Sequence, residues 1–88
     1  MSKTQNSTKG SQGYRYSQDG APDICIMVRK IPGSPCFMVE EIYESTDAPS
    51  GWFSASSCYI DDAKDMAEAA NMMCNLVLGR RRLDAISG

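Results

Sequence analysis

In the first half of the chain, hydrophobic residues form short runs separated by turn residues, a pattern typical of β-strands. The run 24–28 is rich in β-branched residues and lies between two prolines, which predicts a central strand over 24–30. Pro32 and Gly33 predict a type II turn, because proline presets the first φ angle and glycine permits the positive second one. The chain re-enters as a strand over 36–43, so the two segments form an antiparallel hairpin.

Two weaker patterns extend this sheet. Tyr14-Arg15-Tyr16 alternates aromatic and polar side chains ahead of the turn residues 18–22, which predicts a short edge strand. Residues 45–51 have the composition of a loop. The serine-rich segment after it carries Trp52 and Phe53, and we expect a third strand over 52–58.

Helical periodicity begins after residue 60. Asp61 or Asp62 is expected to cap a helix over 62–78, and Gly79 to end it. The three arginines that follow, 80–82, complement the negative end of the helix dipole. Its predicted apolar stripe consists of Ala63, Met66, Ala67, Ala70, Met73, Cys74 and Val77.

These elements predict an α+β domain: a three-stranded antiparallel sheet, four-stranded if 14–16 joins, with one amphipathic helix packed on one face. We expect a flexible polar tail over 1–13, because that segment is almost wholly polar, a single domain over 14–82, and a C-terminal tail over 83–88.

A single helix covers only one face of such a sheet, so the other face is solvated or covered by a partner. Alternation along 36–43 places Phe37, Val39, Glu41 and Tyr43 on one face, and Cys36, Met38, Glu40 and Ile42 on the other. We expect the uncovered face to be the one that carries Phe37, Val39 and Tyr43.

Charge and residue composition limit the kinds of reaction and ligand that the sequence can support. Nine basic and eleven acidic residues give a net charge of −2, and histidine, the commonest general base, is absent. The glycines show no phosphate-binding spacing, and no apolar run approaches the roughly 20 residues that span a bilayer. We therefore expect no enzymatic activity, no cofactor and no metal site. The polar start of the chain has no apolar core of the kind that a secretory signal needs, so we expect a cytoplasmic protein.

Four cysteines, at positions 25, 36, 58 and 74, lie within apolar stretches and form no CxxC pair. This favours buried reduced thiols over structural disulfides, and both over a zinc site. Three aspartates at 61, 62 and 65 could hold a divalent ion, but helix capping also explains them. Cys58, three residues before Asp61, is a candidate nucleophile against the simpler interpretation of a buried thiol.

The middle of the chain offers a candidate partner-binding site. Segment 23–60 carries five acidic and two basic residues. An acidic cluster beside a loop tryptophan is typical of protein interfaces, although the tryptophan could instead fill the end of the core. The candidate residues are Glu40, Glu41, Glu44, Asp47 and Trp52.

Two alternatives remain open. A nucleic-acid-binding module could use Tyr14, Arg15, Tyr16, Arg80, Arg81 and Arg82, with arginines on phosphates and tyrosines stacked on bases. A homodimer could form through the uncovered face of the sheet.

In its organisation the chain resembles the small phage-encoded inhibitors of bacterial defence, the anti-CRISPR proteins among them. The polar start 1–13, the hairpin 24–43 and the single helix from Asp61 to Leu78 carry this resemblance. It implies a non-enzymatic protein in the host cytoplasm that docks on a larger protein or nucleoprotein complex and blocks it sterically. Inhibitors that mimic nucleic acid are usually more acidic than this chain. A second likeness is to the strand–strand–strand–helix DNA-binding domain of integrases, whose sheets are basic where this chain has Glu40, Glu41 and Glu44.

Overall fold

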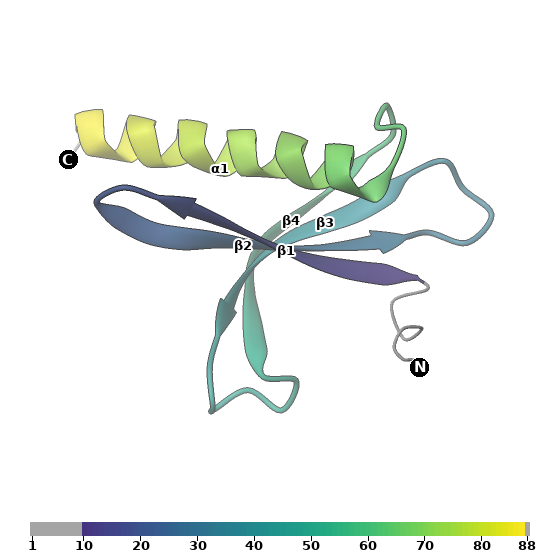
Figure 1. The fold of residues 1–88 in the computed structure, drawn as a ribbon, viewed down its shortest axis with the longest axis horizontal. Coiled ribbons are helices and arrows are strands. Elements are labelled where there is room, and N and C mark those ends of the chain that lie inside the picture. Colours follow the sequence, from purple (N-terminus) through teal and green to yellow (C-terminus); the bar gives the residue numbers. More distant parts are fainter. Residues whose placement is uncertain (1–9, 88) are drawn as a thin grey trace.

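The computed structural model describes residues 10–87 and shows a four-stranded antiparallel sheet followed by one helix (Figure 1). The strands are β1 (Ser11–Gln18), β2 (Ala21–Lys30), β3 (Phe37–Glu44) and β4 (Trp52–Ile60), and the helix is α1 (Met66–Ser87). The strands lie in the sheet in chain order, so β1 and β4 are its two edges. The predicted α+β class is confirmed, and the segment around Tyr14 supplies the fourth strand.

The turns form where glycine permits a positive φ. Between β2 and β3, the amide of Ser34 donates to the carbonyl oxygen of Ile31 at 3.2 Å, and Gly33 has a φ of 75°. This confirms the type II turn predicted from Pro32 and Gly33. Between β1 and β2, Gly20 has a φ of 72° in a short turn.

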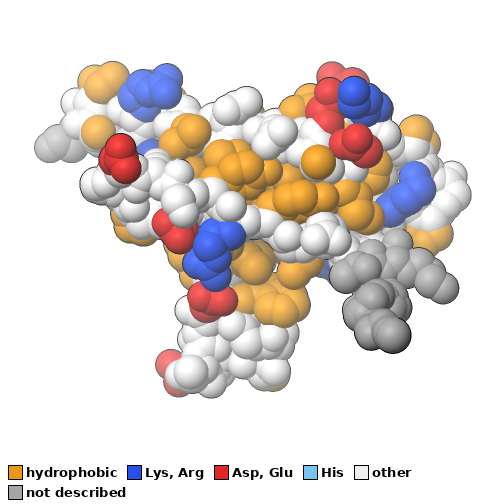
Figure 2. Space-filling model, viewed as in Figure 1, with side chains coloured by type: hydrophobic (Ala, Val, Ile, Leu, Met, Phe, Trp, Pro, Cys, Tyr) orange, Lys and Arg blue, Asp and Glu red, His pale blue; other side chains and the backbone are white. Residues whose placement is uncertain are grey.

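The core lies between α1 and one face of the sheet, where hydrophobic side chains form a continuous band (Figure 2). Every second residue of β2 contributes to it, because alternate side chains share a face: Ile24, Ile26 and Val28 are almost wholly buried. The helix contributes Ala69, Ala70, Met73, Cys74 and Val77. α1 packs over β2 and β3 and, to a lesser extent, over β1.

The prediction that the face with Phe37 and Val39 is the uncovered one is wrong. Phe37 and Val39 lie under the helix and are buried. The alternation itself is confirmed. Because Glu40 and Glu41 lie on opposite faces, each face of β3 carries a carboxylate, and β3 alone does not show which face is apolar. β2 decides it, because its β-branched residues all lie on the face that also carries Val39.

The helix begins later than predicted. Asp65, not Asp61 or Asp62, is the capping residue: its Oδ1 accepts from the amide of Glu68 at 2.9 Å. Glu68 Oε1 in turn accepts from the amide of Lys64 at 2.7 Å. The two bonds give partners to the amide of Glu68 in the first helical turn and to the amide of Lys64 just before the helix, as in a capping box.

Asp65→Ala is expected to lower the free energy of unfolding by about 1 kcal/mol, because it removes the acceptor for the Glu68 amide. Asp61→Ala is the matched control and is expected to change stability by less than about 0.5 kcal/mol. Chemical denaturation followed by circular dichroism measures both. Equal losses for the two variants would contradict the assignment of the cap.

The helix also ends later than predicted, because Gly79 does not stop it and α1 continues to Ser87. Glycine inside a helix costs about 1 kcal/mol relative to alanine but does not break it. Two arginines of the next turn, Arg80 and Arg81, hold this part of α1 to the sheet through Glu41. They act in mid-helix rather than at its C-terminal end.

The element bounds shift the predicted domain limits at both ends. β1 begins at Ser11, inside the predicted polar tail, and the rest of that tail, 1–9, lies outside the described residues. α1 continues through most of the predicted C-terminal tail 83–88. No helix within residues 10–87 has the length and apolar character needed to cross a membrane.

β3 and β4 together bend away from the helix at a β-bulge. Glu41 pairs with Ser56 and Ile42 with Ser54, so Ala55 is the extra residue. Bulges increase the local twist. Beyond this point the hairpin projects away from α1 as an arm (Figure 1), and Trp52 lies on this arm rather than at the end of the core.

Candidate functional site

The face of the sheet opposite α1 is the candidate site, and we call it the open face. Strand register places its side chains in cross-strand rows, because directly paired residues point to the same side. No helix or strand of residues 10–87 packs over it. The side chains of the open face that enter the argument are Arg15, Cys25, Met27, Arg29, Met38, Glu40, Ile42, Glu44, Trp52 and Tyr59.

Apolar side chains form the centre and the two ends of the open face. Cys25, Met27 and Met38 are half-buried on the central strands. Tyr59, which pairs with Met38, is 68% exposed at one end. Trp52 is half-buried at the other end, on the arm. Methionine and aromatic side chains in this setting offer large, adaptable contact area.

Charged pairs bridge the strands between these apolar groups. Arg29 donates to Glu40 Oε1 at 2.7 Å. Glu40 is directly opposite Met27, so this bond crosses diagonally between two neighbouring rows. Arg15 lies 3.2 Å from Glu44 and 3.5 Å from Asp23. The hydrogen bond to Glu44 raises the pKa of Arg15 above its ordinary value, as does the one to Asp23. Both arginines of the face are therefore paired with carboxylates on other strands of the sheet.

A shallow pocket of about 250 Å³ lies beside the Arg15–Glu44 pair. Cys25 and Ile42 line it, and Gly13 borders it without a side chain. The pocket has a charge pair at its border and apolar atoms inside. Such a lining suits a side chain with an apolar stem, which fills the pocket, and a polar end, which reaches the arginine.

The structure divides the predicted acidic site. Glu40, Glu44 and Trp52 lie on the open face, and Asp47 is exposed in the loop that follows β3. Glu41 points the other way, as alternation predicted, and is 3% exposed under the helix.

Glu41 is held there by three groups. Its carboxylate oxygens lie 3.5 Å from Arg80 and 3.9 Å from Arg81, and Oε2 accepts a 2.9 Å hydrogen bond from the hydroxyl of Tyr43. Arg81 also donates to the carbonyl oxygen of Pro22 at 2.9 Å. This carboxylate therefore joins α1 to the sheet.

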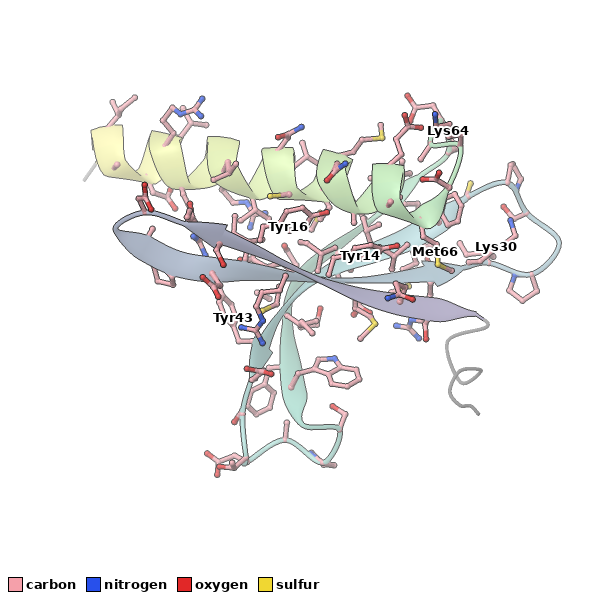
Figure 3. All side chains as sticks on the ribbon, in the orientation of Figure 1. Tyr14, Tyr16, Lys30, Tyr43, Lys64 and Met66 are labelled. Atoms are coloured by element: carbon pink, nitrogen blue, oxygen red, sulfur yellow. The ribbon has the colours of Figure 1, made fainter. Side chains whose placement is uncertain are left out.

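The residues of the nucleic-acid alternative are likewise separated. Tyr14 and Tyr16 point toward α1 and pack on the core (Figure 3), and the hydroxyl of Tyr16 donates to Asn71 Oδ1 at 2.9 Å. Burial raises the pKa of both tyrosines; the charge of Asp65 adds to it for Tyr14. Arg15 lies on the opposite face, so these aromatic and basic groups form no common surface.

All four cysteines are free thiols. Cys58 lies inside β4, where its sulfur is 3.8 Å from that of Met73, and not at the start of the helix. Burial raises the pKa of Cys74, and nearby Arg81 partly opposes this. Neither thiol is placed for nucleophilic attack. Among residues 10–87, no three cysteine or carboxylate side chains converge as metal ligands do.

Six residues of the open face were not among the candidates from the sequence: Cys25, Met27, Arg29, Met38, Ile42 and Tyr59. The signal lay in β2, where one alternate set is wholly β-branched and the other mixes sulfur and charge. The uniform set marks the core face, and the mixed set marks the face that meets solvent or a partner. Comparison of the chain with models of known protein families, with curated proteins and with solved structures gave no match in any of the three.

Proposed function

We propose that this chain is a small binding protein, without enzymatic activity, that docks on a larger protein through its open face. The observation that carries the proposal is an uncovered sheet face with half-buried apolar side chains between ordered charge pairs. Protein interfaces combine an apolar centre with a polar rim in this way. The two aromatic residues at its ends, Trp52 and Tyr59, are of the kinds that dominate binding energy.

The charge of the open face favours a protein partner over nucleic acid. Its two arginines are opposed by Asp23, Glu40 and Glu44, so the face has no excess of positive charge. Binding to phosphate backbones depends on such an excess.

The finer form of the proposal is an inhibitor of the phage anti-defence type, which blocks its target by occupying a surface that the target needs. Organisation supports it: the resemblance to small phage-encoded inhibitors rests on a small antiparallel sheet followed by one helix. Steric blocking requires only that the open face bind, and it uses no catalytic group.

The test is capture of a partner from nuclease-treated bacterial lysate, with mass spectrometry to identify it. We expect wild type to retain one stoichiometric protein or complex, and the double variant Trp52→Ala, Tyr59→Ala to bind it at least about 30-fold more weakly. Phe53→Ala is the matched control. Phe53 is an exposed aromatic residue next to Trp52 on the same strand, but it points to the other face.

Two results would contradict the proposal. Equal capture by wild type and the double variant would remove the open face as the binding site. Capture that requires intact nucleic acid would remove the protein-binding function itself.

A further inference from the structure

The helix carries a second apolar stripe, in which Met72 packs partly against the core while the leucine and isoleucine side chains are largely exposed. We call it the seam; it consists of Met72, Leu76, Gly79, Leu83 and Ile86. Three of its side chains are among the most exposed large hydrophobic groups of the molecule: Leu76 at 56%, Leu83 at 65% and Ile86 at 77%. Helical geometry places the seam on a different side of α1 from the buried stripe that includes Met73 and Val77.

The seam lies on the flank of α1 that faces β4. Met72 and Leu76 line a groove of about 350 Å³ together with Tyr59 and Ile60 at the end of β4. Arg80, beside the seam, reaches Ser56 of β4 at 3.4 Å. On the opposite flank of α1, Asn71 and Arg81 contact β1 and the start of β2.

The spacing of the seam matches another helix. Its successive intervals are four, three, four and three residues, which is the heptad spacing of a coiled-coil contact. Gly79 lies at the centre, and a Cβ there would meet no atom within 4 Å, so no contact among residues 10–87 requires a glycine. A glycine at the middle of an apolar helix face lets a second helix backbone approach closely there.

The seam is also complementary to itself. Met72 and Ile86 each lie seven residues from Gly79, so two antiparallel copies that cross at Gly79 place Met72 of one chain on Ile86 of the other. Leu76 then meets Leu83. The seam contains no charged residue, and the charge of Arg80 beside it is already compensated by Glu41.

β4, on the same flank, supports an interface between copies on this side. It is an edge strand of nine residues, Trp52–Ile60, without a charged residue or proline. Edge strands that face solvent usually carry charges or proline, which prevent association with other chains. β1, the other edge, carries Arg15. Both edges have an irregularity in their pairing, β1 between Tyr16 and Gln18 and β4 at Ala55, so charge is what distinguishes them.

From these observations we propose that the chain forms a twofold-symmetric dimer in which the seams of two α1 helices pack antiparallel and cross at Gly79. The contact explains why the last turns of α1 remain helical although Leu83 and Ile86 pack on nothing within the described residues. Helices in proteins owe most of their stability to packing of an apolar face. The interface differs from the uncovered sheet face suggested by the sequence, and it leaves both open faces accessible.

Sedimentation velocity of the full chain tests the proposal. Wild type is expected to be dimeric at micromolar concentration. The double variant Leu83→Glu, Ile86→Glu is expected to raise the dissociation constant of the dimer at least about 100-fold, because each substitution acts twice in a symmetric contact. Its circular dichroism spectrum should stay that of a folded protein, since both residues are exposed. Trp52→Ala, at the start of β4 and outside the groove beside the seam, is the control and should remain dimeric.

Disulfide trapping tests the orientation. A mixture of Met72→Cys and Ile86→Cys chains should form a mixed disulfide that exceeds the background of wild type under the same oxidant. Preferential trapping of Met72→Cys with itself would indicate parallel helices and overturn the antiparallel arrangement. A monomeric wild type at millimolar concentration would overturn the dimer.

Discussion

Replacement of both Arg80 and Arg81 by alanine is expected to lower the free energy of unfolding by about 3 kcal/mol, measured by denaturant titration. The double variant would leave the Glu41 carboxylate buried under α1 without a positive charge. An uncompensated buried charge is among the most destabilising defects that a substitution can create. The hydrogen bond from Tyr43 compensates only one of its two oxygens.

Replacement of Glu41, instead of the arginines, is expected to lower the free energy of unfolding by less. Glu41→Leu leaves the two arginines without their partner, but their side chains are 46% and 28% exposed and can turn toward water. Adding Glu41→Leu to the double arginine variant should therefore restore part of the lost stability, because no charge then remains buried. Equal stability of wild type and the double arginine variant would show that the ion pairs do not hold the helix.

This asymmetry bears on the nucleic-acid alternative. Two of the three arginines in the run 80–82 have a structural partner, and only Arg82 forms no ion pair within residues 10–87. Arg80 is itself exposed, so in the nucleic-acid alternative Arg80 would have to bind phosphate at the expense of its contact with Glu41. A loss of nucleic-acid affinity in the Arg80, Arg81 double variant would have to be separated from its loss of stability, whereas Arg82→Ala is a test without that complication.

Local sequence signals were enough to predict the elements of the fold. The β-branched run of β2, the Pro32-Gly33 turn and the apolar stripe of the helix each depend on neighbours within a few residues. The helix ends were predicted less well. A local signal for the start was present, because, of Asp61, Asp62 and Asp65, only Asp65 is followed three residues later by a glutamate, Glu68, which is the spacing of a capping box. The end was different: Gly79 is a reasonable stop until the contacts of the following turn with the sheet are known.

The candidate site depended on contacts across the sheet and was predicted only in part. Alternation correctly separated Glu40 from Glu41 on β3. Their partners, Arg29 and Arg80, lie on other elements, and the second is 39 residues away from Glu41. No pattern along one strand reveals such pairs, so four acidic residues that appear as a cluster in sequence serve different purposes in the fold.

Apart from Tyr59, which lies on the open face by register and also lines the groove beside the seam, the two proposals use opposite layers of the molecule, so each can fail without the other. The open face belongs to the sheet, and the seam belongs to the helix. If both hold, one dimer presents two docking faces, and a target with repeated subunits would be bound more tightly than one face allows. Variants of the seam would then reduce binding to such a target while leaving the affinity of each single face unchanged.

Two neighbouring residues of β2 provide the sharpest separation of fold from function. Ile26 points into the core and is 0% exposed, whereas Met27 lies on the open face and is half-buried. Ile26→Ala is expected to lower the free energy of unfolding by about 3 kcal/mol, because it opens a cavity between α1 and the sheet. Met27→Ala is expected to cost less than about 1 kcal/mol, since its surroundings remain open to solvent.

The order of effects should reverse for binding to the captured partner. Met27→Ala removes an apolar contact from the middle of the open face and should weaken binding about tenfold, as measured by calorimetry on folded protein. Ile26→Ala, measured below its unfolding temperature, should bind the partner as wild type does. If Met27→Ala bound normally while Ile26→Ala did not, the helix side of the molecule would carry the docking surface instead, and the open face would be only the solvated side of the sheet.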